Sequence, residues 1–144
     1  MAGGMIRVDT VNTFSSLFLL SCGPRMRFQT AQERANGLAP EQDRTRDGQL
    51  KFECQVAVTY HSLPGARIQS EVLSVTITGS TDPAASVPPG PVELDGLRCG
   101  LSTAEAGEGG RIRGGKLWWQ ADRIFAFGTS TNGSKSYGKS EVAA

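Results

Sequence analysis

The clearest pattern in the chain is a strict alternation of apolar and polar residues over residues 51–60. Alternate side chains of a strand point to opposite faces, so this period of two predicts a strand with one buried face. Aromatic and β-branched residues in the run favour the same interpretation. The apolar positions are Phe52, Cys54, Val56, Val58 and Tyr60.

A second strand is predicted over residues 68–78, where Leu73, Val75 and Ile77 share one face. The segment between the two strands contains Pro64-Gly65, a pair that favours a turn. The two strands are therefore expected to form a hairpin.

Three further strands are expected from weaker patterns. Residues 14–28 alternate loosely and are expected to bend at Gly23-Pro24, because proline cannot donate to a ladder. Residues 92–101 change the parity of their apolar positions at Asp95-Gly96, which is typical of a β-bulge. Residues 116–127 form the last expected strand and are rich in aromatic residues.

The segments between and beyond these strands are polar and rich in glycine. Residues 29–48 are expected to be a long excursion with a short helix over residues 31–35, and residues 103–115 are expected to be a loop. Residues 1–13 show no clear pattern and are expected to be a flexible N-terminus. Residues 128–144 hold little to bury and are expected to be a disordered tail, which leaves one domain over residues 14–127.

The number of strands and the scarcity of helix predict an all-β fold. A sheet with one apolar face must close on itself or find a second layer, and a small five-stranded barrel of the oligonucleotide-binding (OB) type is an economical solution. The bulge at Asp95-Gly96 and the bend at Gly23-Pro24 supply the curvature that closure requires.

Two runs resemble bacterial single-stranded-DNA-binding (SSB) proteins. Residues 89–97 read PGPVELDGL, similar to the strand that enters the last hairpin of those proteins, and residues 117–124 read LWWQADRI, similar to their closing strand. Residues 43–48 read DRTRDG, and the aromatic-led strand over residues 50–58 follows them. This order resembles small OB-like proteins encoded on plasmids and integrative elements of high-GC Gram-positive bacteria.

The resemblance implies a protein that binds single-stranded DNA during replication or transfer. It is also compatible with a homo-oligomer, since SSB-like barrels often pair through their strands.

The net charge of +1 gives the chain no global basic field, so affinity for nucleic acid would have to come from local clusters of cations. Binding of single strands needs cations near the phosphates and flat rings on which bases stack. Trp118 and Trp119 are adjacent, so we expect one ring to be buried and the other exposed. The candidate nucleic-acid-binding residues are Arg44, Arg46, Lys51, Arg111, Arg113, Lys116, Trp118 and Trp119.

No set of residues suggests catalysis, a cofactor or a metal ion. His61 is the only histidine, and no Cys/His/Asp cluster has the spacing of a zinc site. The glycine-rich stretch before Lys116 is not a phosphate-binding loop, because Leu117 stands where Ser or Thr is required. The chain is therefore expected not to be an enzyme.

The three cysteines, Cys22, Cys54 and Cys99, have no CxxC spacing and are expected to be reduced, buried thiols of a cytoplasmic protein. No apolar run is long enough to span a membrane. Two alternatives remain open. One is a protein-interaction module with an OB-like fold. The other is an extracytoplasmic lipoprotein lipidated at Cys22, because residues 19–22 read LLSC after an apolar stretch.

Overall fold

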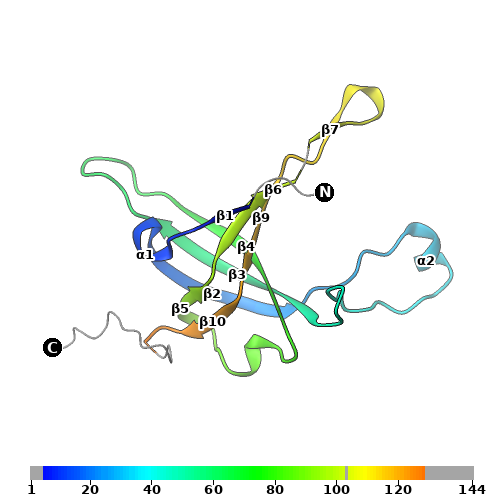
Figure 1. The fold of residues 1–144 in the computed structure, drawn as a ribbon, viewed down its shortest axis with the longest axis horizontal. Coiled ribbons are helices and arrows are strands. Elements are labelled where there is room, and N and C mark those ends of the chain that lie inside the picture. Colours follow the sequence, from blue (N-terminus) through cyan, green and yellow to red (C-terminus); the bar gives the residue numbers. More distant parts are fainter. Residues whose placement is uncertain (1–4, 103, 129–144) are drawn as a thin grey trace.

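The computed structural model describes residues 5–102 and 104–128, and these residues form a mostly β fold (Figure 1). The expected all-β class is confirmed. Of the two ends expected to lack order, residues 1–4 and 129–144 lie outside the described residues. Residues 5–13 contain strand β1 (Met5–Arg7) and helix α1 (Thr10–Thr13), for which the sequence showed no pattern.

Three long strands form an antiparallel meander: β2 (Phe14–Pro24), β3 (Leu50–Tyr60) and β4 (Ser70–Gly79). The alternation in β3 separates buried from partly exposed side chains as expected, and Leu73, Val75 and Ile77 of β4 are buried beside them. The hairpin predicted from residues 51–78 is therefore confirmed.

The last two expected strands are each divided. The first comprises β5 (Gly90–Asp95) and β6 (Arg98–Leu101), and the second comprises β9 (Leu117–Ala121) and β10 (Arg123–Ala126). β5 pairs with β10, and β6 pairs with β9. The chain bends between β5 and β6 at Gly96, whose φ of 68° is readily available only to glycine, and this is where the apolar parity changes.

The main sheet has eight strands in the order β1-β6-β9-β4-β3-β2-β5-β10. Each pairing in it is antiparallel except that of β4 with β9, which is parallel. The order is that of an open sheet, with β1 and β10 at its two edges.

Two arms leave the sheet on the same side of Figure 1. The α2 arm, residues 25–49, joins β2 to β3 and contains α2 (Ala31–Ala35), the short helix expected there. The second arm joins β6 to β9 and contains β7 (Glu105–Ala106), η2 (Glu108–Gly110) and β8 (Ile112–Arg113). β7 and β8 pair with each other and form a separate small sheet. A further turn of 3-10 helix, η1 (Pro83–Ala85), connects β4 to β5.

The core lies on one face of the meander and also includes residues of β5, β9 and β10. Its buried members are Phe14, Leu19, Cys54, Val56, Val58, Leu73, Val75, Ile77, Val87, Val92, Leu94, Leu97, Ala121 and Ile124. They come from six strands and from the loops before and after β5, so the core holds together segments that are distant in the sequence.

The structure corrects the expectation of three reduced thiols. Cys22 and Cys54 form a disulfide between β2 and β3, and Cys99 is free and half-buried. The register places Cys22 directly opposite Cys54, with their Cα atoms 4.1 Å apart. A separation of 32 residues gives no hint of this proximity, because it depends on how the two strands align.

The segment that resembled a lipoprotein leader is part of the sheet. Phe14 and Leu19 of β2 are core residues, and the sulfur of Cys22 is bonded to Cys54. Neither observation favours lipidation at Cys22. Within the described ranges, no helix is both long and apolar enough to cross a bilayer.

Candidate nucleic-acid interface

The side of β3, β4, β9 and β6 that faces away from the core is here called the outer face. Its residues are assigned from the alternation in each strand and from the register between strands. It carries mainly small polar groups and one large aromatic ring. Its members are Lys51, Glu53, Gln55, Ser74, Thr76, Thr78, Arg98, Gly100, Trp118 and Gln120.

The two tryptophans point to opposite faces of β9, as their adjacency predicts, but the expected contrast between a buried and an exposed ring is not found, because both are half-buried. Trp119 is aligned with Val75 on one side and Cys99 on the other, and its half-buried ring packs against the core. Trp118 is aligned with Gly100 and lies on the outer face, also half-buried. The structure thus assigns the outward position to Trp118.

The indole of Trp118 lies against the backbone of Gly100. A Cβ atom built on Gly100 would overlap the Cζ2 and Cε2 atoms of the ring. Gly100 does not have a left-handed φ, so the close approach of the ring, and not the backbone conformation, requires glycine. The ring of Trp118 therefore covers the backbone of Gly100 on the neighbouring strand β6.

Two arginines lie on the strands beyond Trp118: Arg98 is two residues along β6 from Gly100, the register partner of Trp118, and Arg7 is one strand farther, on β1. Arg7 of β1 is directly opposite Arg98 of β6, and Gln120 is the partner of Arg98 on the other side. Like charges directly opposite each other destabilise a sheet unless an anion compensates them. Arg98 has one such anion, since its Nη1 atom lies 2.9 Å from Oδ1 of Asp122. Arg7 is exposed and has no ion-pair partner among residues 5–102 and 104–128.

Lys116 precedes Trp118 by two residues, on the opposite side from Arg98. Its backbone amide donates to Oγ of Ser102 at 3.0 Å. Its side chain is exposed, as is that of Arg111 at the tip of the second arm. Arg113 lies in β8. The structure thus brings Lys116 next to Trp118 and places Arg111 and Arg113 farther out on the arm.

The other predicted basic group lies on the α2 arm and at the start of β3. Arg44 and Arg46 are exposed, and Nη1 of Arg44 donates to the carbonyl of Gly48 at 3.0 Å. Nζ of Lys51 lies 3.6 Å from Oδ2 of Asp43, which neutralises part of its charge. When the register of β4 and β9 is extended by one residue, Trp118 lies beside Ser74 of β4. Lys51 aligns instead with Thr78, which is four residues farther along β4. Ser74 and Thr78 are about 13 Å apart along β4, so the basic group formed by Arg44, Arg46 and Lys51 is not beside the ring of Trp118.

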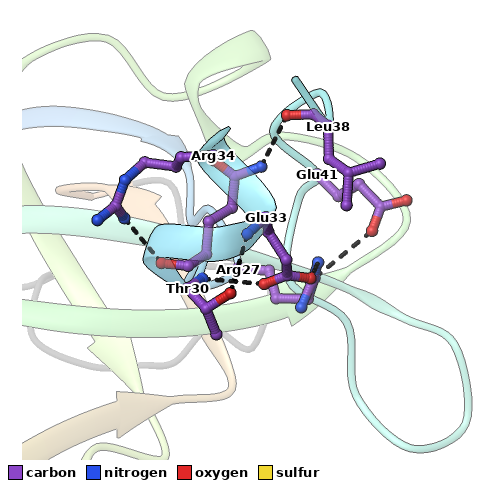
Figure 2. Close-up of polar contacts among 7 residues, drawn as sticks. Arg27, Thr30, Glu33, Arg34, Leu38 and Glu41 are labelled. Atoms are coloured by element: carbon purple, nitrogen blue, oxygen red, sulfur yellow. Dashed lines mark hydrogen bonds and ion pairs between the residues drawn. The ribbon is translucent and has the colours of Figure 1, made fainter. Parts of the chain in front are cut away.

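The α2 arm is held in shape by its own polar contacts (Figure 2). Thr30 and Glu33 form a capping box at the start of α2, in which each side chain accepts from the backbone amide of the other residue. Nη2 of Arg27 lies 3.2 Å from Glu33, and Nε of Arg27 lies 3.5 Å from Glu41. The bond from the Thr30 amide, assisted by Arg27, lowers the pKa of Glu33, and the bond to Glu33 raises the pKa of Arg27.

One further arginine connects this arm to the outer face. Nη1 of Arg25 donates to Oγ1 of Thr76 on β4 at 3.2 Å, and its Nε atom is 4.0 Å from Asp43. The arm and the sheet therefore meet through a cation that lies on the outer face.

Arg7, Arg98 and Gly100 belong to this site but were not predicted from the sequence. Arg98 and Gly100 alternate with the apolar positions Leu97, Cys99 and Leu101, so the parity within residues 92–101 held the signal that they face outward. Arg7 lies in a segment without periodicity, and no local pattern marks it.

Chemically, the outer face offers a ring for stacking, hydroxyl and amide groups for hydrogen bonds, and cations on both sides of the ring. In the part of the chain that the structure describes, no group of three or more His, Cys, Asp or Glu side chains is arranged to hold a metal ion. Comparison with known protein families, with curated proteins and with solved structures gives no match.

Proposed function

We propose that the protein binds single-stranded nucleic acid, in the first place DNA, on its outer face and acts as a non-catalytic accessory in replication or transfer. The observation that carries this proposal is the position of Trp118. Its ring lies on the outward side of β9 between Lys116 and the facing pair Arg7 and Arg98.

The spacing of these groups suits a polynucleotide. Trp118 and Gln120 are at alternate positions of β9, so their side chains emerge about 7 Å apart on the same face, and Lys116 directly precedes this strand. A base stacked on Trp118 would leave its flanking phosphates near Lys116 on one side and near Arg7 and Arg98 on the other. Stacking on an aromatic ring contributes about 1–3 kcal/mol per base and does not depend on sequence.

Within the all-β class, we propose an OB-like barrel as the specific fold that goes with this function. Its support is that the main strands belong to five chain segments, because only Gly96 and Leu97 separate β5 from β6 and only Asp122 separates β9 from β10. The β5–β6 segment contacts β2 through β5 and reaches β9 through β6, while β9 pairs in parallel with β4. In the proposed barrel, this hairpin would join the two ends of the meander.

The test is a fluorescence titration with a dT oligonucleotide of about 16 nucleotides, the upper site size of one OB fold. It uses Trp119→Phe protein, so that Trp118 is the only source of tryptophan emission. We expect quenching at low salt with a micromolar Kd. Trp118→Ala should weaken binding about 5- to 150-fold, which corresponds to the loss of one stacked base.

Arg7→Ala and Arg67→Ala form a matched pair for the charge contribution. Both residues are exposed and lack an ion-pair partner in the described ranges, but Arg67 lies in the turn between β3 and β4, away from Trp118. Removing one phosphate contact should reduce the slope of log K against log salt by about 0.7 for Arg7 and should leave it unchanged for Arg67. Absence of quenching, or equal slopes for the two variants, would contradict the proposal.

A cytoplasmic location belongs to the same proposal, because single-stranded intermediates of replication and transfer arise there. The bond between Cys22 and Cys54 provides a test, since disulfides persist mainly in oxidising compartments. Alkylation of thiols in cells lysed directly into denaturant should modify all three cysteines if the protein is cytoplasmic, and the denaturant is needed because Cys54 is buried in the folded protein. Modification of Cys99 alone would place the protein in an oxidising compartment.

A further inference from the structure

The pairing between β2 and β5 is short. β2 pairs with β3 over its whole length, but on its other side only Phe18 and Leu19 are aligned with β5. β5 continues from Val92 to Asp95 in partnership with β10 alone. The amide of Phe14 donates to the carbonyl of Thr10 in α1. In the described ranges, residues 15–17 of β2 and residues 92–94 of β5 therefore each have one edge without a ladder partner.

These two open edges line opposite walls of one groove. The groove has a volume of about 670 Å³ and is bordered by residues 14–17 of β2 and residues 91–94 of β5. Thr10 and Val11 of α1 lie at one end, next to the start of β2 (Figure 1). The pairing of Phe18 with Pro91 closes the other end. The space thus has the position of a missing strand of limited length.

The floor of the groove is apolar, and a single carboxylate lies among its lining residues. Phe14, Val92 and Leu94 are buried at 5%, 2% and 6% exposure, and Leu17 is half-buried beside them. Among the described residues that line the groove, Glu93 is the only carboxylate and none is a lysine or an arginine. One oxygen of Glu93, Oε2, accepts from the amide of Gly128 at 2.9 Å.

We propose that this groove binds an extended segment of a partner protein, which enters between β2 and β5 as an additional strand. Unpaired strand edges present rows of N–H and C=O groups that another chain can satisfy. Small molecules offer no such row, so an extended peptide is the ligand that fits both walls. β2 and β5 are antiparallel to each other, so the inserted strand is parallel to one of them and antiparallel to the other.

The dimensions and lining define the segment. The open run of β2, residues 15–17, is three residues long, which accommodates about 10 Å of extended chain. Two apolar side chains at positions i and i+2 would face Leu17, Val92 and Leu94. The residue between them would face outward near Glu93, where a lysine or arginine matches the charge.

The probe for the test is the peptide acetyl-Thr-Val-Lys-Val-Thr-amide, added to the isotopically labelled full chain. We expect a Kd on the order of 100 µM and amide chemical-shift changes centred on residues 15–17 and 92–94. Leu17→Lys should weaken binding at least about tenfold, since it places a cation in the apolar floor. Leu63→Lys is the matched control at an exposed turn and should leave binding unchanged.

Two further measurements test the same groove if Leu17→Lys fails to fold. Glu93→Lys should lose the lysine peptide and gain the peptide with Glu at its centre, because the charges are exchanged. N-methylation of the peptide on either edge should abolish binding, since an inserted strand uses both edges, whereas a strand added to β1 or β10 uses one.

Binding that survives N-methylation of one edge would overturn the proposal, as would shift changes outside the groove or no binding by either peptide up to about 1 mM. Trp118→Ala should leave peptide binding unchanged. The outcome is therefore independent of nucleic-acid binding on the outer face.

Discussion

Substitution of Gly100 by alanine tests the packing that holds Trp118 on the outer face. In most strands this change is favourable by about 0.5–1 kcal/mol, because glycine loses more conformational entropy on folding than alanine does. Here the new methyl group would overlap the indole of Trp118, so the ring must move away from β6. We therefore expect the sign of the effect to be reversed.

The magnitude follows from the area that the displaced ring exposes. A tryptophan in a folded protein buries about 150–250 Å², and the return of roughly a third of this to water costs about 1.5 kcal/mol. Gly23 of β2 is the matched control, since it also lies in a strand without left-handed φ, but a Cβ atom added to it would have no neighbouring atom within 4 Å. The two substitutions should differ by about 2 kcal/mol in the free energy of unfolding.

The assay is urea unfolding followed by far-UV circular dichroism, which does not depend on either tryptophan. Gly100→Ala is measured in the wild type and in Trp118→Ala protein, so that the cycle isolates the contact between the two residues. The penalty should disappear once the ring is absent. An equal penalty in both backgrounds, or equal effects at Gly100 and Gly23, would refute the idea that the ring requires this glycine.

Three other changes have expected outcomes. Gly96→Ala should lower the free energy of unfolding by about 1–3 kcal/mol in urea titrations, because φ is 68° there and the methyl group would overlap the carboxylate of Asp122; a neutral effect would exclude strain at this bend. Burial and the hydrogen bond to Glu71 raise the pKa of Tyr60 to about 12 in the folded protein. Above about pH 10 the phenol ionises in the unfolded chain only, so the free energy of unfolding should fall with pH until the folded phenol also ionises. Tyr60→Phe should remove this decline between pH 10 and about 12, as followed by thermal unfolding. Reduction of the bond between Cys22 and Cys54 should lower stability by about 3–4 kcal/mol, as expected for a loop of this length, while the Cys22→Ser variant should not respond to reductant.

Much of the local structure follows from short-range patterns. The alternation in residues 51–60 and in residues 68–78 is sufficient to predict β3 and β4 and their buried faces, because the period of a strand is a local property of the backbone. Thr30 and Glu33 similarly indicate where α2 begins, since a capping box involves residues three positions apart. The adjacency of Trp118 and Trp119 likewise requires that they face opposite sides.

Contacts between distant segments were decided by the tertiary structure alone. Which indole faces outward depends on the pairing of β9 with β4 and β6, and the approach of Arg7 to Arg98 depends on an N-terminal strand without periodicity. The disulfide between Cys22 and Cys54 and the groove between β2 and β5 depend on register in the same way. Register arises from the packing of a whole core, in which a shift of one residue would turn every side chain of a strand to the other face, and no short stretch of sequence contains that information.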